Sequence, residues 1–299
     1  MRDRKYDGLL VVDKEPGPTS HDVVAMIRRI TRMRRIGHCG TLDPSSTGVL
    51  LVCLGRFTRL NEWLSAGEKE YRAVLMLGAV SDTYDSQGSI SSMGEVEVPE
   101  VDTLRDRLQE FKGAIEQIPP VFSALKVHGV RSYKLARSNR AVPLKPRQVH
   151  VAAIEIIEYE FPQLVLRVVC SKGTYIRSLA ADLGTRLGCG AYVQELRRLR
   201  VGNLDLSRAL KLDGIRDAEM EGRLEQSFIP PHQALSGLPS VHLEPRRLMS
   251  FVHGHSVHLS QADAHKGQIC AVYDLEQGFY GMGRREGEEE LRPVKVLRN

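Results

Sequence analysis

One segment of twelve residues constrains this 299-residue chain more than any other feature. Residues 37–48 read GHCGTLDPSSTG, a run of small, polar and turn-forming residues. Five arginines crowd the segment before it, and the apolar run from Val49 to Leu54 after it predicts a buried strand. Polar loops held by a rigid scaffold often carry function, so this loop is the first place to look for chemistry.

Asp43 is the only carboxylate in this loop. Pro44 restricts the backbone of Asp43 to extended or turn conformations, which helps to fix the direction of its side chain. A functional carboxylate is one interpretation. The other is an Asx-type turn, in which Asp43 only accepts main-chain N–H bonds, and the spacing alone favours that turn.

A second candidate site lies at residues 170–179, CSKGTYIRSL. The pattern predicts a strand end, a turn of small residues and the start of a helix, whose N-terminus attracts anions. Lys172 adds positive charge there, and Arg177 lies about one turn into the helix. An arginine in the first turn opposes the helix dipole, so we expect a carboxylate or phosphate partner for it. The alternative is an arginine that faces solvent.

The remaining patterns predict a mixed α/β domain followed by a small β domain. Residues 8–12 and 71–77 are expected to be strands, and 149–159 with 164–170 a strand pair. Thr19 is a candidate N-cap, with Asp22 three residues later. Asp102 could cap a helix that extends to Phe111. Gly188 is expected to end the helix that starts near Ile176. Beyond about Gly237, short β-like runs alternate with glycines.

Charge distribution favours a polyanionic partner. The net charge is +5 with a sequence pI near 9.0, which alone is weak support. Between Ser123 and Arg147, however, no acidic residue accompanies seven basic ones: Lys126, Arg131, Lys134, Arg137, Arg140, Lys145 and Arg147. A solvated basic surface is the alternative, but nucleic-acid contact explains the missing carboxylates better.

Cysteines and hydrophobic runs exclude several other classes. The five cysteines are widely spaced with no CxxC pair, so neither a zinc site nor a disulfide framework is expected, and reduced thiols in a cytoplasm fit best. No apolar run is long enough to span a bilayer, and no apolar segment follows the charged N-terminus as in a secretory signal.

Several segments together resemble the TruB family of tRNA pseudouridine-55 synthases. They are GHCGTLDPSSTGVLLVCLGRFTRL, KEYRA, SDTYDSQG, PPVFSALKVHGVRSYKLAR, CSKGTYIRSLAADLG and CGAYVQELRRLRVG, in the family's order. The resemblance covers roughly the first two hundred residues, and the C-terminal part resembles the family's PUA-type RNA-binding domain more loosely. One departure is visible, because Lys14-Glu15 stands where the family often has Lys-Pro.

The resemblance implies a role for each matching residue. Asp43 is implied as the catalytic aspartate, Tyr71 as the tyrosine that stacks on the target base, and Arg177 as the partner of Asp43. Tyr175 is implied beside the pocket, Leu196 as an apolar wall, and His38 as the residue that fills the gap left by the flipped uridine. Without the resemblance, Tyr71 and Leu196 would be ordinary core residues. RNA contacts are implied for Lys14, Lys126, Arg131, Lys134 and Arg137.

The resemblance also implies a fold and a reaction. The expected fold is α+β, with a mixed, largely antiparallel sheet in residues 1–236, an RNA-binding thumb insertion at about 119–147, and a PUA-like β domain in 237–299. The expected reaction converts uridine 55 in the T-arm of tRNA to pseudouridine, after the base is flipped out. No cofactor, metal, membrane or obligate protein partner is expected, and the protein is expected to be a cytoplasmic monomer.

Three alternatives stay open. One is the guide-RNA-dependent branch of the same family, against which the basic thumb-like segment argues. Another is a tRNA-binding and folding module. The third is an unrelated glycosidase, which would usually need a second catalytic carboxylate that neither candidate segment obviously supplies. The sequence leaves open whether Asp43 attacks the sugar carbon or removes a proton from the sugar.

Overall fold

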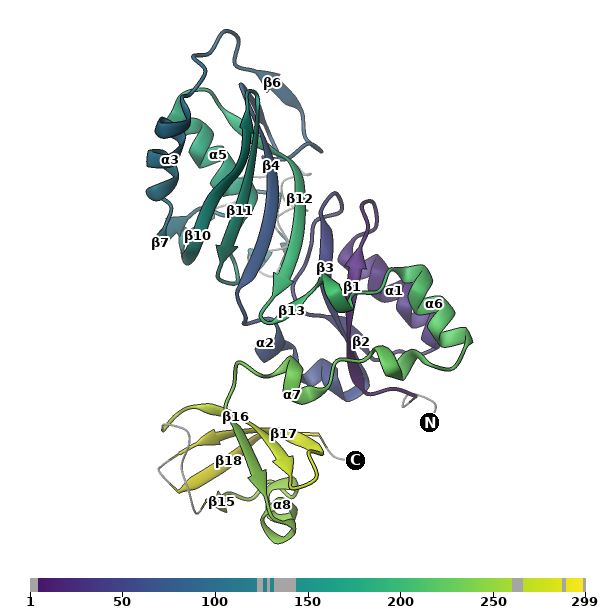
Figure 1. Cartoon of the computed structure of the whole chain (residues 1–299). Coiled ribbons are helices and arrows are strands. Elements are labelled where there is room, and N and C mark those ends of the chain that lie inside the picture. The colour runs from purple at the N-terminus through teal and green to yellow at the C-terminus, as the bar shows by residue number, and fades with distance from the viewer. Residues whose placement is uncertain are drawn as a thin grey trace.

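The computed structural model describes residues 5–122, 126–127, 130–131, 144–259, 266–286 and 289–297. They form a large part built on a nine-stranded sheet and a smaller C-terminal part built on a five-stranded sheet (Figure 1). In the large part, helices α3 and α5 cover one end of the sheet, while α1 and α6 lie side by side at the other (Figure 1). No helix in the described ranges combines the length and hydrophobicity needed to cross a membrane.

The first half of the large part alternates strands with short helices. Its elements are β1 (Gly8–Lys14), α1 (Ser20–Thr31), β2 (Ile36–His38), β3 (Thr47–Leu54), the 3₁₀ helix η1 (Gly55–Leu60), α2 (Asn61–Leu64), β4 (Lys69–Leu77), β5 (Ala79–Ser81), β6 (Ile90–Ser92), α3 (Val101–Gln109) and β7 (Gly113–Gln117).

Two short strands, β8 (Lys126–Val127) and β9 (Val130–Arg131), then pair with each other. The second half comprises β10 (Arg147–Glu160), β11 (Gln163–Cys170), α5 (Ile176–Leu187), β12 (Ala191–Val201), β13 (Leu204–Asp205), η2 (Leu206–Arg208), α6 (Leu212–Met220), η3 (Leu224–Ser227) and α7 (Pro231–Ala234).

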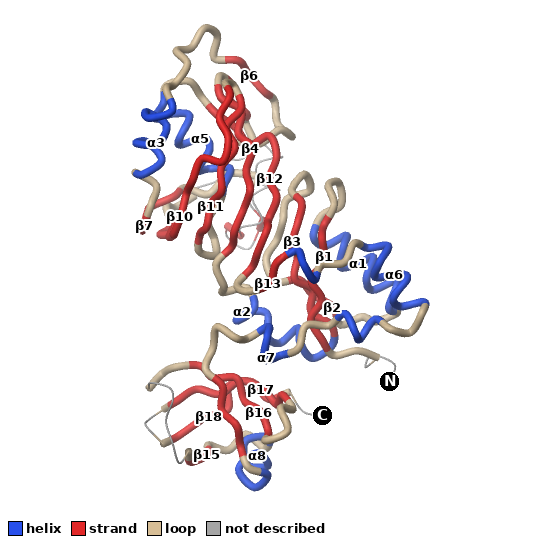
Figure 2. The backbone as a smooth tube through the Cα atoms, in the orientation of Figure 1, coloured by secondary structure: helices blue, strands red, loops and turns tan. Residues whose placement is uncertain are grey.

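The large sheet has the order β1-β3-β12-β4-β11-β10-β7, with β2 paired to β3 and β13 to β12 (Figure 2). All of these pairs are antiparallel except β12 with β3, which run parallel over a short stretch. The predicted mixed, largely antiparallel α+β fold is therefore confirmed. The parallel contact joins the two halves of the sheet, and it involves the strand that follows the Asp43 loop.

The strands predicted from continuous apolar runs are buried on both faces. This is expected, because a strand with one exposed face would show alternating hydrophobic and polar residues. In β1, Leu10 and Val12 pack in one core cluster, and Leu9 and Val11 pack in another on the opposite face. Residues of β3 alternate in the same way. The loop that follows β2 is thus anchored to strands with no solvent-exposed face.

Helix ends followed the expected chemistry in two of three cases. Thr19 caps α1, accepting from the main-chain N–H of Asp22 while the Asp22 carboxylate accepts from that of Thr19, which is the predicted capping box. Gly188 ends α5 in the left-handed conformation, as predicted. The predicted cap by Asp102 is wrong, because α3 begins at Val101 and Asp102 lies in its first turn, paired with Arg105.

The C-terminal part contains the predicted β runs as β15 (Val257–His258), β16 (Ile269–Asp274), β17 (Phe279–Arg285) and β18 (Glu290–Val296). Two elements were missed, β14 (Ser240–Leu243) and α8 (Pro245–Val252). Strand β14 pairs with β16 in parallel, a long-range contact that no local turn signal announces. The smaller part is therefore a curled β-sheet that carries one helix.

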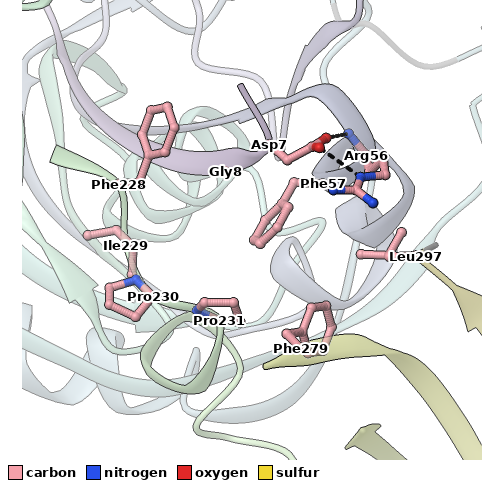
Figure 3. A pocket seen from close by; sticks show the side chains of 10 residues that line it. All are labelled: Asp7, Gly8, Arg56, Phe57, Phe228, Ile229, Pro230, Pro231, Phe279 and Leu297. Atoms are coloured by element: carbon pink, nitrogen blue, oxygen red, sulfur yellow. Dashed lines mark hydrogen bonds and ion pairs between the residues drawn. The ribbon is translucent and has the colours of Figure 1, made fainter. Parts of the chain in front are cut away.

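The two parts share a hydrophobic cluster. Phe57 and Leu60 of the large part belong to the same buried cluster as Tyr273 and Met282 of the small part. Beside it lies a cavity of about 280 Å³, walled by the rings of Phe57, Phe228 and Phe279 and bounded on one side by the Asp7–Arg56 ion pair, whose atoms are 2.7 Å apart (Figure 3). None of the predicted site residues lines this cavity.

Candidate active site

The loop that carries Asp43 is held by side chains from three separate elements. Ser20, at the start of α1, is fully buried and bonds Leu42 twice, donating to its carbonyl at 2.9 Å and accepting from its N–H at 2.8 Å. Arg198 of β12 donates to the carbonyls of Gly40 and Val49, at 3.1 and 2.7 Å. Buried carbonyl groups need such donors, so this loop has little freedom to move.

Lys14, at the end of β1, is the third support. It is only 1% exposed, and its Nζ donates to the carbonyls of Glu15, Pro44 and Ser46 at 3.1, 3.0 and 2.7 Å. Burial lowers the pKa of Lys14 to about 8, although the nearby Asp43 carboxylate opposes that shift. The predicted RNA contact does not fit this position, because the ammonium group is buried beneath the loop and engaged by its carbonyls.

Arg177 is the centre of the site. This side chain lies in the first turn of α5 and is almost fully buried. Its Nε lies 3.0 Å from Oδ2 of Asp43, and its Nη1 lies 3.2 Å from Oδ2 of Asp85. It also donates to the carbonyls of Thr83 and Phe122, at 3.1 and 3.0 Å. The carboxylate partner expected for a first-turn arginine is present, and the solvent-facing alternative is wrong.

Asp85 is the site residue that sequence reasoning missed. Its side chain is 11% exposed, and its Oδ1 accepts from the hydroxyl of Thr83 at 2.6 Å and the N–H of Gln87 at 3.0 Å. The second carboxylate near Asp43 thus comes from outside the two candidate segments, neither of which supplies an obvious one. The segment SDTYDSQG, which contributed to the family resemblance, contained this signal.

Asp43 differs from Asp85 in exposure and surroundings. Its side chain is 36% exposed, so one side is open to solvent or substrate. Burial of the rest raises the pKa of Asp43 above its ordinary value, and the Asp85 carboxylate reinforces that rise, while Arg177 and Lys14 oppose it. The two cations thus favour the ionised form of a carboxylate that burial would otherwise tend to protonate.

Tyr71 and Leu196 lie on two adjacent strands of the sheet. In the pairing of β4 with β12, Tyr71 is opposite Arg198 and Ala73 is opposite Leu196, so both side chains project from the same face. Tyr71 is 7% exposed and Leu196 is partly buried against the main core. Burial raises the pKa of the Tyr71 phenol, which Arg198 partly opposes.

Tyr175 precedes α5 and is fixed by its main chain. Gln117 accepts from the N–H of Tyr175 at 2.8 Å and donates to its carbonyl at 3.0 Å. Ser178 likewise donates to the carbonyl of Ile118 at 2.8 Å. The start of α5, with Arg177, is therefore clamped to residues 117–122 at the base of the predicted thumb insertion.

His38 lies at the end of β2, five residues before Asp43, and is half-buried. Its ring packs edge-on against the ring of His21, with centroids 5.0 Å apart. The structure thus brings Asp43, Asp85 and Arg177 together, with Tyr71 and Leu196 on the neighbouring strands and His38 at the entrance to the loop. Among the described residues, no three His, Cys, Asp or Glu side chains gather as metal ligands would.

The remaining predicted RNA contacts lie in the thumb-like segment. For Lys126 and Arg131 the backbone is described, as the paired strands β8 and β9. Lys134 and Arg137 lie outside the described residues.

Comparison with known proteins gives a consistent family. A family model described as TruB family pseudouridylate synthase (N terminal domain) matches residues 28–176. Models described as tRNA pseudouridylate synthase B C-terminal domain and Pseudouridine synthase II TruB, C-terminal, match residues 177–236 and 239–297.

Individual relatives match nearly the whole chain. The chain is 41% identical over 291 residues to a tRNA pseudouridine synthase B of Dehalococcoides mccartyi strain 195, covering 97% of this chain and 96% of that protein. It is 35% identical over 293 residues to the tRNA pseudouridine synthase B of Clostridium acetobutylicum, covering 97% and 99%. It is also similar to a chain in the solved structure of an H/ACA RNP bound to a substrate RNA containing 2′-deoxyuridine, at 28% identity and a TM-score of 0.77, covering 98% of this chain and 85% of that one.

Proposed function

The chain belongs to the TruB family of pseudouridylate synthases, and on that premise we propose that it converts uridine to pseudouridine at position 55 in the T-arm of tRNA. The observation that carries the proposal is the Asp43–Arg177 ion pair, at 3.0 Å, in a loop whose carbonyls are held by Ser20, Lys14 and Arg198. Relatives that align with this chain along almost all of their length are named as acting on tRNA.

The reaction needs one reactive carboxylate beside the sugar. The bond between C1′ of the ribose and N1 of uracil breaks, the base turns over, and a bond forms between C1′ and C5. The proton on C5 is lost and N1 gains one, so the overall change is an isomerisation that needs no added reactant. Asp43 would act on the sugar, either by attack on C1′ or by removal of a proton. Its open side and its ionised form suit both roles.

The neighbouring residues would keep the detached base in place. Tyr71 would form a flat floor under the uracil and Leu196 an apolar wall, while Tyr175 would border the pocket. Arg177 would aim the Asp43 carboxylate, and Asp85 would hold Arg177 from the other side. The target base is stacked in folded RNA, so it must be flipped out, and His38 would fill the space that it leaves.

Binding would come from basic surfaces outside this pocket. We propose that Lys126, Arg131, Lys134 and Arg137 contact phosphates, and that the C-terminal β domain is a PUA-like RNA-binding domain. Each lost phosphate contact should reduce the slope of log affinity against log salt by about one. An unchanged slope after alanine replacement of three of these residues would contradict the thumb contact. We also propose that the protein is a monomer and acts in the cytoplasm.

The guide-RNA-dependent reaction is the second candidate, because the solved H/ACA RNP chain is similar over nearly the whole of this chain. One experiment separates the two. The pure protein is incubated with an unmodified tRNA transcript without any other RNA, and pseudouridine is mapped at single-nucleotide resolution. Product at position 55 alone supports the proposal. Product that appears only after a guide RNA is added would support the second candidate, and no product in either case would contradict both.

A further inference from the structure

Arg198 is a buried arginine whose charge no carboxylate in the described ranges balances. The residue is 1% exposed. Its guanidinium donates to the main-chain carbonyls of Gly40, Thr41 and Val49, at 3.1, 3.5 and 2.7 Å. These three acceptors lie on both sides of Asp43 in the sequence. A buried charge is costly unless its surroundings compensate it, so an arginine held by main-chain carbonyls and the Tyr71 side chain requires an explanation.

The local backbone is shaped so that Arg198 can reach the loop. Strand β12 meets β3 in parallel only at Arg197 opposite Thr47 and Arg198 opposite Gly48. A Cβ on Gly48 would lie 2.1 Å from the carbonyl oxygen of Arg198, and Gly48 has a φ of +97°. Glycine is thus required here on two counts, close approach and conformation. This approach brings the β12 backbone against the strand that ends the Asp43 loop.

The same arginine lies opposite Tyr71 in the pairing of β12 with β4. Asp43 and Tyr71 come from different elements, a loop and a strand, and neither element by itself fixes their separation. Arg198 comes from a third element that touches both. Its guanidinium donates from Nη2 to the carbonyl of Gly40, from Nη1 to the carbonyl of Thr41 and from Nε to the carbonyl of Val49. The single ammonium group of a lysine cannot reproduce this planar arrangement of donors.

We propose that Arg198 is a positioning residue that sets the placement of Asp43 relative to Tyr71, and so relative to a uracil stacked on that tyrosine. This inference rests on the proposed function. The role of Arg198 differs from that of Arg177, which contacts the Asp43 carboxylate directly. Arg198 acts through the main-chain carbonyls around Asp43 and through its side-chain hydrogen bond with Tyr71, and it does not touch the reacting atoms.

The test compares three variants with the wild-type protein. Arg198→Lys keeps the buried charge and can reach one carbonyl, whereas Arg198→Met keeps the volume without the charge. Arg197→Met is the matched control, since Arg197 is the adjacent residue on the same strand, is 37% exposed and pairs with Asp13 at 2.9 Å. For each protein, thermal unfolding, tRNA affinity by filter binding and the single-turnover rate of pseudouridine formation are measured.

We expect Arg198→Lys to fold and to bind tRNA within about threefold of wild type, while its rate falls by at least about 100-fold, as for a displacement of about 1 Å at a reacting group. Arg198→Met should lose at least as much rate, and Arg197→Met should keep the wild-type rate. An Arg198→Lys protein that is more stable than Arg198→Met but no faster would show that Arg198 positions the site and does not only support the fold.

Two results would overturn the inference. One is a folded Arg198→Lys protein with the wild-type rate. The other is a rate loss that is fully explained by a smaller fraction of folded protein, including the case in which neither Arg198 variant folds. This second result would mean that Arg198 only supports the fold. Failure of the proposed function is distinguishable, because then the wild-type protein and Arg197→Met would form no pseudouridine either.

Discussion

Replacement of Arg177 by methionine should disable the site without removing any reactive group. Arg177 makes four contacts, with the carboxylates of Asp43 and Asp85 and the carbonyls of Thr83 and Phe122. Methionine fills much of the same space but donates to none of them. Asp85 would keep the bonds from Thr83 and Gln87, whereas Asp43 would lose the group that aims it.

The magnitude follows from the number and burial of these contacts. Breaking a buried ion pair by removing one partner costs about 3–5 kcal/mol, and Asp43 is 36% exposed, so the lower end of that range applies to stability. Loss of one preorganised donor at a reacting group lowers rates about 10²–10³-fold. We therefore expect about 3 kcal/mol of destabilisation and at least a hundredfold lower single-turnover rate.

The pH dependence gives an independent signature. Arg177 is the largest influence that lowers the pKa of Asp43, and the Asp85 carboxylate, which raises it, would remain. The rate should fall as pH drops through the pKa of Asp43, because the ionised form reacts. In Arg177→Met that acidic limb should lie at higher pH than in the wild type.

The assay is single-turnover pseudouridine formation on tRNA across the stable pH range, beside chemical denaturation. Arg186→Met is the matched control, because Arg186 lies on the same helix but is 41% exposed and pairs with Glu110 at the surface. It should change neither rate nor profile. A folded Arg177→Met protein with the wild-type rate and an unmoved acidic limb would show that Arg177 neither aims Asp43 nor lowers its pKa.

Two further predictions concern Lys14, which supports the Asp43 loop, and the C-terminal part of the chain. Lys14→Met should lower the rate and the thermal stability at pH 7, because the carbonyls of Glu15 and Ser46 lose a buried donor, at about 1–3 kcal/mol each. The pKa of Lys14 is about 8 in the folded protein and 10.5 ordinarily, so between pH 8 and 10.5 the folded protein binds fewer protons than the unfolded chain. In denaturation curves, the stability of the wild type relative to Lys14→Met should therefore rise by about 3 kcal/mol from pH 8 to 10.5. A difference that stays constant with pH would contradict this prediction. A chain ending at residue 236 keeps every site residue but exposes Phe57 and Leu60, so it should unfold cooperatively with about 3 kcal/mol less stability and bind tRNA more weakly. Unchanged stability would show that the shared cluster contributes nothing.

Local patterns predicted most of the secondary structure, because the signals were local. The apolar runs of β1 and β3, the capping box at Thr19 and the glycine after α5 each act within a few residues. The missed elements depend on distant contacts. Strand β14 is stabilised by β16 about thirty residues later, and Asp85 becomes a site residue only because α5 brings Arg177 beside it.

The site itself was only half visible in the sequence. An arginine in a first helical turn is locally unusual and predicted a partner for Arg177, whereas the spacing around Asp43 favoured an Asx-type turn and only the family resemblance implied a catalytic carboxylate there. An RNA contact of Lys14 was implied by the family resemblance, and only the tertiary structure shows that Lys14 is buried. Arg198 gave no local sign, since its neighbours Arg197 and Arg200 are surface residues of similar appearance.

Asp43 is the residue on which the proposed reaction depends, and the Asp43→Asn variant tests this role most directly. Asparagine keeps the size of the side chain but lacks the charge and the reactivity. A residue needed only in the transition state lowers the rate without weakening binding. Asp102→Asn serves as the charge-matched control, because Asp102 is 81% exposed on α3.

The measurement is the single-turnover formation of pseudouridine in tRNA by Asp43→Asn, beside filter binding, with the intact amide confirmed by mass spectrometry. We expect no product above background, tRNA affinity within about threefold of wild type, and full activity of Asp102→Asn. Substantial pseudouridine formation by the verified Asp43→Asn protein would remove Asp43 from the mechanism.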